Sequence, residues 1–92
     1  MNDIPIEDIL SSKGRVKILK IMVKLGELNI SEIAKKAELN YTTTLQHLTT
    51  LEKAQLVYEK HFGRIRIYKF RRDNSKAIAI KNLIEFWESN KP

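Results

Sequence analysis

The side chains best suited to a chemical task lie between residues 40 and 54, a segment rich in hydroxyl and amide groups. On a helix of about 3.6 residues per turn, Thr44, Leu48 and Leu51 share one face, which we expect to be the core. Threonine is a mediocre helix former, so helix propensity does not explain its use on the other face. That outer face carries Thr42, Thr43, Gln46, Thr49, Thr50 and Lys53.

Such a face suits hydrogen bonding to a DNA duplex. Threonine hydroxyls reach phosphates or base edges, threonine methyls pack on thymine methyls, and a glutamine amide pairs with the donor and acceptor of adenine. Short side chains also let a helix lie deep in the major groove. We therefore predict double-stranded DNA as the partner, the alternative being a polar face in plain solvent.

A second candidate contact is a basic hairpin. Residues 56–62 and 65–71 are rich in β-branched and aromatic residues with a period of two, and Gly63-Arg64 joins them. Arg64 and Arg66 near the tip could enter a minor groove or clamp phosphates. Alternatively, these charges only protect an edge strand from aggregation. Alternation places Arg66 on the face of the aromatic residues, which leaves its direction open.

The net charge of +6 is unevenly distributed along the chain. Residues 41–72 carry seven basic and two acidic side chains, residues 1–40 carry seven and six, and residues 73–92 carry three of each. A local excess of this kind suits a polyanion, whereas dispersed charge serves only solubility. The charge distribution by itself fits two interpretations: a nucleic-acid partner, or an ordinary face exposed to solvent.

Catalytic and metal-binding constellations are missing from the sequence. His47 and His61 are the only histidines, and neither has a second histidine or a carboxylate at ligand spacing, so we expect no zinc site. His47 lies at the edge of the core face, where packing or a phosphate contact would suit it. Ser11 and Ser12 lack a nearby histidine or a nucleophile elbow. We expect no enzyme and no cofactor, and no pattern specifies a small-molecule effector.

The chain lacks cysteine, a basic leader followed by an apolar run, and any stretch of roughly 18 apolar residues. We therefore expect a cytoplasmic, nucleoid-associated protein with no membrane partner.

The surrounding elements must hold the hydroxyl-rich helix and the hairpin in place. Apolar spacing predicts a helix over residues 13–25 that ends at Gly26. A short helix then begins at Ser31 as its N-cap and ends at Ala37, and Asn40 caps the next helix.

This order predicts an α+β fold that is mainly helical, a winged helix-turn-helix with a C-terminal dimerisation helix. We expect one domain over residues 1–92, with its core over 11–72 and the terminal helix over 75–89. A generic α+β domain is the alternative.

The terminal helix carries more apolar surface than so small a domain can cover, ending in Phe86 and Trp87. We therefore expect a homodimer, the alternative being a helix that packs only on its own domain. The predicted dimer residues are Val16, Ala77, Ile80, Leu83, Ile84 and Trp87.

The segments Ser31–Ala37 and Leu39–Val57 resemble the ArsR-like winged-helix regulators of archaea and bacteria. Ser11–Leu19 and Gly63–Tyr68 fit the same pattern, and the resemblance covers about residues 6–72. It implies a dimer formed through the first and last helices, with the third core helix in the major groove and the wing beside it. By position it implies base or phosphate contacts at Tyr41, Thr42, Thr43, Gln46, His47, Arg64 and Arg66.

Three departures from the family pattern matter. Gln55 replaces the glycine that usually ends the recognition helix, so we expect a less sharply turned helix end. Leu45 replaces a small or polar residue and should either contact a thymine methyl or pack unusually. The cysteines and histidine–acid pairs of the metal-sensing members are absent, so metal sensing is not carried over.

Three functions fit these observations. The leading one is a sequence-specific transcription regulator, most simply a repressor, because a purely architectural DNA binder would favour lysine on the reading face. The others are that architectural binder and a winged helix that contacts only proteins. The predicted DNA-binding residues are Tyr41, Thr42, Thr43, Gln46, His47, Thr50, Lys53, Arg64 and Arg66.

Overall fold

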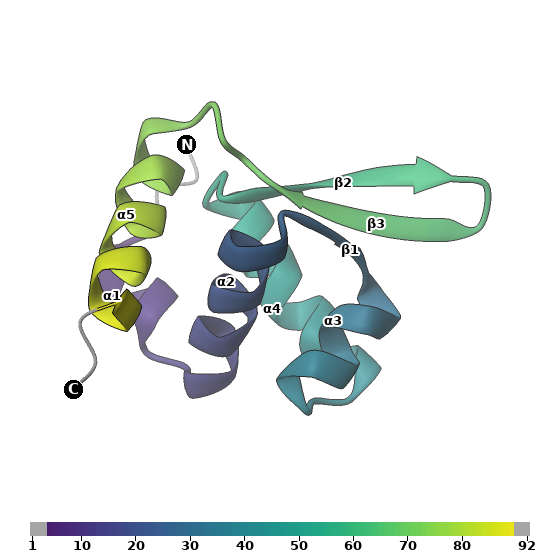
Figure 1. The fold of residues 1–92 in the computed structure, drawn as a ribbon. Coiled ribbons are helices and arrows are strands. Elements are labelled where there is room, and N and C mark those ends of the chain that lie inside the picture. Colours follow the sequence, from purple (N-terminus) through teal and green to yellow (C-terminus); the bar gives the residue numbers. More distant parts are fainter. Residues whose placement is uncertain (1–3, 90–92) are drawn as a thin grey trace.

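A computed structural model describes residues 4–89, so residues 1–3 and 90–92 of the predicted domain lie outside the described part. The described residues form five helices and a small antiparallel sheet (Figure 1). In chain order the elements are α1 (Ile6–Leu10), α2 (Lys13–Leu25), β1 (Glu27–Asn29), α3 (Ile30–Ala37), α4 (Tyr41–Lys53), β2 (Val57–Phe62), β3 (Ile65–Phe70) and α5 (Ser75–Ser89). This order confirms the mainly helical α+β winged-helix fold.

The helix ends follow mostly from local hydrogen bonding. The Ser12 side chain accepts a hydrogen bond from the Arg15 amide at 3.2 Å and begins α2, and Gly26, with φ of +83°, ends it. The Asn40 carboxamide oxygen accepts from the Thr43 amide at 2.7 Å, which confirms Asn40 as the cap of α4.

The beginning of α3 differs from the prediction. Asn29, not Ser31, is the N-cap: its side chain accepts from the Glu32 amide at 2.8 Å, and the Glu32 carboxylate accepts from the Asn29 amide at 3.1 Å. This capping box satisfies two backbone donors at once, whereas a Ser31 cap would satisfy one. Ser31 instead lies exposed in the first turn.

The end of α4 also corrects the sequence-based expectation. Gln55 adopts a left-handed φ of +62°, so the helix ends as sharply as it would at a glycine. The Leu56 amide donates to the Leu51 carbonyl at 2.9 Å, and the Leu56 side chain is buried. These interactions hold a conformation that costs a residue with a Cβ roughly 1–2 kcal/mol.

The sheet places the hairpin against the helices at one end and leaves its tip free. Its strand order is β1-β3-β2, with Val57 opposite Phe70 at the base and Phe62 opposite Ile65 at the tip. Val57, Tyr68 and Phe70 are buried against the helices. The hairpin then projects away from the helical body as a wing (Figure 1).

The predicted core face of α4 is confirmed. Thr44, Leu48 and Leu51 are fully buried, and the Thr44 hydroxyl donates to the Asn40 carbonyl at 2.8 Å. Leu45 is half-buried and packs against the same core, so unusual packing, rather than exposure to a ligand, describes this departure from the family pattern.

The terminal helix α5 lies at the end of the molecule opposite the wing (Figure 1). The prediction that Ala77 lies in a dimer seam is wrong, because its side chain is fully buried within the protomer. Ile80 and Ile84 are half-buried and pack against the protomer's own core, and Val16 on α2 is also half-buried. The exposed apolar residues of α5 are Ile78, Leu83, Phe86 and Trp87.

Within residues 4–89, no helix has the length and apolarity that crossing a membrane would require.

The strain at Gln55 predicts a stabilising substitution. Gln55→Gly should raise the free energy of unfolding by about 0.5–1 kcal/mol, because glycine adopts the left-handed conformation without strain but loses more backbone entropy on folding. Thermal denaturation should show a Tm higher by a few degrees. Ala54→Gly is the matched control: Ala54 is right-handed, so its replacement should lower Tm. A lower Tm for Gln55→Gly would show that its side chain, not its backbone, matters.

Candidate nucleic-acid interface

The exposed polar groups of the interface lie at the beginning of α4. Tyr41, Thr42 and Gln46 are exposed and Thr43 is half-buried. The Thr42 and Thr43 hydroxyls and the Gln46 carboxamide have no hydrogen-bond partner among residues 4–89. A recognition helix contacts base edges mainly through its N-terminal residues, so the open donors and acceptors lie where a duplex would reach them.

The later threonines of α4 differ from the first ones. The Thr49 hydroxyl donates to the Leu45 carbonyl at 2.8 Å, and the Thr50 hydroxyl donates to the Gln46 carbonyl at 3.3 Å. Their protons therefore remain within the helix, as is common for hydroxyl side chains in helices. These two residues can still present methyl groups and oxygen lone pairs to a partner.

Lys53 is not brought next to the wing. As the last residue of α4 it lies about 18 Å along the helix axis from Tyr41, given a rise of about 1.5 Å per residue. Instead it borders a pocket formed with α1 and α5. Any contact of Lys53 with a duplex would therefore be separate from that of the wing.

A cleft of about 220 Å³ brings the wing and the helix-turn-helix together. Tyr41, Arg64 and Arg66 line it from α4 and the wing, and Asn29 and Ser31 line it from the beginning of α3. Ser31 was missed as a site residue because its type and position suggested a helix cap. With Asn29 as the cap, the Ser31 hydroxyl has no partner within the described part of the chain and faces the same cleft.

Arg66 is held in place by a carboxylate. Its guanidinium donates a hydrogen bond to Glu59 on β2, and the Glu59 carboxylate also lies 3.2 Å from Nε2 of His61. The hydrogen bond from Arg66 lowers the pKa of Glu59, and the same bond, with a further one to Tyr41, raises the pKa of Arg66. Arg66 therefore links the wing to the beginning of α4.

Two other basic side chains of the wing also have a carboxylate nearby. Lys60 and Lys69 lie 3.8 and 3.9 Å from the same Glu27 oxygen, which belongs to β1. Such exposed pairs are weak, but they reduce the local positive potential. Arg64, by contrast, has no carboxylate within 4.0 Å among residues 4–89 and is exposed at the turn. It is thus the wing arginine most available to a phosphate.

His47 packs against the beginning of α2. A Cβ on Gly14 would lie 3.2 Å from its Nε2 atom, and its Nδ1 atom is buried without a hydrogen-bond partner. Burial, and secondarily the charge of Arg15, lowers the pKa of His47 below 6.5. The imidazole is therefore neutral at pH 7, and packing describes it better than an open phosphate contact does. In the described residues, no three histidine or carboxylate side chains gather where they could hold a metal ion.

The model of the bacterial regulatory protein arsR family matches residues 12–59, more than half of the chain. The chain belongs to the ArsR family. The match spans α2, the helix-turn-helix and the beginning of the wing. The family and the fold are those of DNA-binding transcription regulators, not of enzymes.

Solved structures share the fold at low sequence identity. HlyU from Vibrio cholerae is 20% identical over 92% of this chain and 89% of that one, with a TM-score of 0.77. NolR from Sinorhizobium fredii is 21% identical over 89% and 79% of the two chains, with a TM-score of 0.73. The transcriptional repressor PagR of Bacillus anthracis is 23% identical over 84% and 85%, with a TM-score of 0.68. No curated protein sequence matches this ArsR-family chain.

The environment of His47 predicts a pH dependence of stability. Because its folded pKa lies below 6.5, the unfolded chain takes up a proton first, and stability should fall as the pH drops below that value. Replacing His47 with Gln removes this titration, so Tm should change less between pH 7 and about pH 5 than in the wild type. Tm curves with the same slope in both proteins would contradict the burial of His47.

Proposed function

We propose that this ArsR-family protein is a sequence-specific regulator that binds double-stranded DNA with α4 in the major groove. The observation that carries the proposal is the cleft that joins Tyr41, the first residue of α4, to Arg64 and Arg66 of the wing. Thr42 and Gln46 lie exposed on the same helix, with side chains that have no hydrogen-bond partner among residues 4–89. A helix-turn-helix reads bases from this end of its recognition helix. The wing, with Arg64 at its turn, would then lie on the minor groove or the backbone.

The proposed contacts divide into two kinds. Gln46 suits a base edge, because its carboxamide offers both a donor and an acceptor. Arg64 suits a phosphate or the minor groove, whereas Arg66 positions the wing through Glu59 and Tyr41. Contacts from Thr50 and Lys53 stay predictions of the sequence, and we place them at the periphery of the duplex. We assign no contact to His47, which packs against the beginning of α2.

We further propose a homodimer in which α5 packs against its copy. Leu83 and Trp87 are 48% and 71% exposed, which is unusual for large apolar side chains, and Ile6 and Leu10 of α1 are also exposed. A two-fold dimer would place two recognition helices about 34 Å apart and favour a pseudo-palindromic site.

A repressor acting by occupancy is the simplest role for such a dimer. The similar fold of PagR, a transcriptional repressor, supports this assignment. It requires nothing beyond tight binding to one site, so it needs no catalytic group or cofactor.

Selection of bound sites from random duplex DNA, followed by footprinting, tests the function directly. A specific regulator should retain the selected site about 10³-fold or more tightly than bulk genomic DNA. Equal retention of both would favour an architectural DNA binder. Weak, nearly salt-independent binding to every duplex would favour a module that contacts only proteins.

Gln46→Ala should relax the preference at one base pair of the selected site. Loss of a bidentate amide–base pair typically removes about 1–3 kcal/mol of discrimination, so the variant should bind single-base variants of that position almost equally. Asn82→Ala is the matched control, because it removes an exposed carboxamide from α5, at the end of the molecule opposite the wing, and should leave the base preference unchanged. A uniform loss on specific and random DNA would exclude Gln46 as a base reader.

Arg64→Ala should weaken binding to all duplexes similarly. Removing one phosphate contact should reduce the steepness of the log–log salt dependence by about 0.9, measured by titration at several salt concentrations. Lys81→Ala removes one positive charge from α5 at the other end of the molecule and should leave that slope unchanged. Equal slopes for Arg64→Ala and the wild type would remove the wing from the interface.

Leu83→Glu should convert the dimer into monomers that remain folded. Leu83 is exposed on α5, so a carboxylate costs little in the protomer but would be buried against apolar surface in the dimer. Light scattering after size-exclusion chromatography measures the mass, and circular dichroism measures the fold. Asn82→Glu, at an exposed position that is already polar, should stay dimeric. A dimer that survives Leu83→Glu must use another surface.

A further inference from the structure

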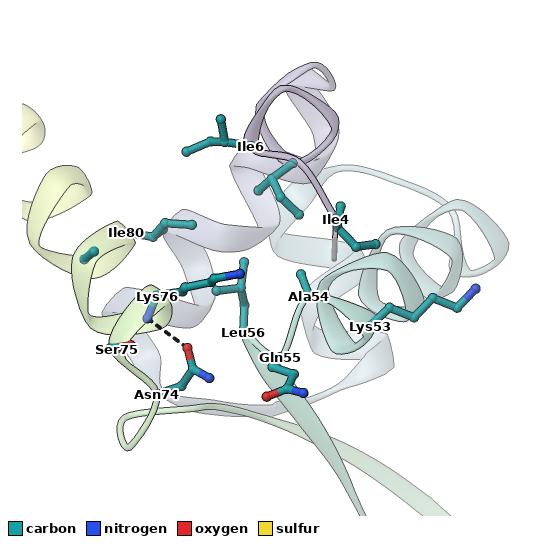
Figure 2. Close-up of a pocket in the computed structure, with 12 residues that line it drawn as sticks. Ile4, Ile6, Lys53, Ala54, Gln55, Leu56, Asn74, Ser75, Lys76 and Ile80 are labelled. Atoms are coloured by element: carbon teal, nitrogen blue, oxygen red, sulfur yellow. Dashed lines mark hydrogen bonds between the residues drawn. The ribbon is translucent and has the colours of Figure 1, made fainter. Parts of the chain in front are cut away.

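A pocket of about 460 Å³ lies away from the wing, between α1, the end of α4 and the beginning of α5 (Figure 2). Its volume falls in the range of about 300–1,000 Å³ that small-molecule sites occupy. None of the features assigned to DNA contact requires a hollow at this place.

Aliphatic side chains form one part of the pocket walls, and polar side chains form the rest. Ile4, Ile6 and Ile9 contribute from the N-terminal segment, and Leu56 and Ile80 contribute from the other side (Figure 2). Ile9 and Leu56 are buried, whereas Ile6 is 58% exposed at the edge. Apolar atoms thus continue from the core to the opening, which suits an apolar ligand body.

One charged side chain, that of the exposed residue Lys76, extends into the pocket. In Figure 2 the Lys76 side chain extends from the beginning of α5 toward the middle of the pocket, whereas the Lys53 ammonium points away from it. Among residues 4–89, no aspartate or glutamate lines the pocket, and no carboxylate lies within 4.0 Å of the Lys76 ammonium. The pocket therefore complements an anion, not a cation.

The position of Lys76 in its helix is unfavourable on local grounds. It lies in the first turn of α5, where the backbone dipole disfavours a positive charge. The free backbone amides there are already served by Asn74, whose side chain accepts from the Lys76 and Ala77 amides at 2.9 and 3.1 Å. A positive charge that is unfavourable for its own helix, and that has no carboxylate partner in the described residues, is typical of a functional site.

We propose that this pocket binds an amphiphilic carboxylate. The aliphatic part of the ligand lies against the isoleucines and Leu56, and the carboxylate pairs with the Lys76 ammonium. A charge-assisted hydrogen bond is stronger than a neutral one. The positive charge of Lys76 therefore favours a carboxylate ligand, and the aliphatic part of the pocket favours a ligand with an apolar chain. An uncharged chain of the same length would leave the ammonium unpaired.

The location of the pocket gives its occupancy a consequence for DNA binding. Ala54 and Gln55 at the end of α4 form one wall, and Ala79 and Ile80 of α5 form another. A ligand between them affects the placement of the reading helix relative to the proposed dimer helix, and such coupling is reciprocal. This consequence rests on the proposed function, whereas ligand binding itself does not.

Isothermal titration of the full chain with decanoate, below its micelle-forming concentration, tests the site. We expect saturable binding with one ligand per chain, and at least tenfold weaker binding of decanol. Lys76→Gln should weaken decanoate binding about tenfold, through loss of the charged partner. Lys81→Gln is the matched control on the same helix, since Lys81 pairs with Glu85 at 3.0 Å, and it should bind decanoate like the wild type.

A second variant closes the pocket without touching the charge. Ala79 is exposed and borders the pocket, so Ala79→Phe should fill it and abolish decanoate binding while leaving the circular dichroism spectrum unchanged. Equal affinity for decanoate and decanol, or unchanged binding by Lys76→Gln or Ala79→Phe, would overturn the carboxylate site.

The regulatory consequence is measured separately. Saturating decanoate should change the Kd of the wild type for its selected DNA site and leave that of Ala79→Phe unchanged. A wild-type Kd that does not respond would overturn the coupling while the titration upholds the site. If no duplex is bound under any condition, the proposed function fails, and the titration alone still decides whether the pocket takes a carboxylate.

Discussion

The arrangement of this molecule depends on one helix that is buried on one face and open on the other. Thr44, Leu48 and Leu51 of α4 are fully buried, so α4 cannot rotate about its axis without moving a polar face into the core. That restriction holds Thr42 and Gln46 toward the surface. The exposed face of α4 is thus positioned by the packing of its opposite, buried face.

The part of the wing that does not pack on the hydrophobic core is held by hydrogen bonds between charged side chains. Tyr68 and Phe70 anchor the base of the hairpin, but the residues nearer the tip lie beyond the helices. There Glu59 binds Arg66, which in turn contacts Tyr41 at the beginning of α4. One carboxylate therefore orients the wing relative to the recognition helix and leaves Arg64 as its open cation. Because Glu59 pairs with Arg66, the positive charge of Arg64 is the one left without a carboxylate among residues 4–89.

The opposite end of the molecule combines two kinds of apolar surface. On α5, Leu83 and Trp87 are exposed, whereas the pocket beside Lys76 is a hollow between α1, α4 and α5. Both involve α5, and the hollow also touches the end of α4. Residues at the end of α4 and at the beginning of α5 line this pocket from two sides, far along the helix axis from Thr42 at the beginning of α4.

The sequence by itself determined the order of the main helices and of the hairpin, the cap at Asn40, and the core face of α4, because these depend on spacing and on hydrogen bonds between near neighbours. Only the tertiary structure decided the partner of Arg66, the burial of Ala77 and the pocket beside Lys76. Each depends on contacts between different elements of the fold. The same holds for Glu27 of β1, which pairs with two lysines of the wing, although a count of charges along residues 41–72 leaves both lysines without a carboxylate partner. Periodicity likewise identifies an apolar stripe on α5 but not whether the protomer or a second copy covers it, since that depends on what lies opposite in space.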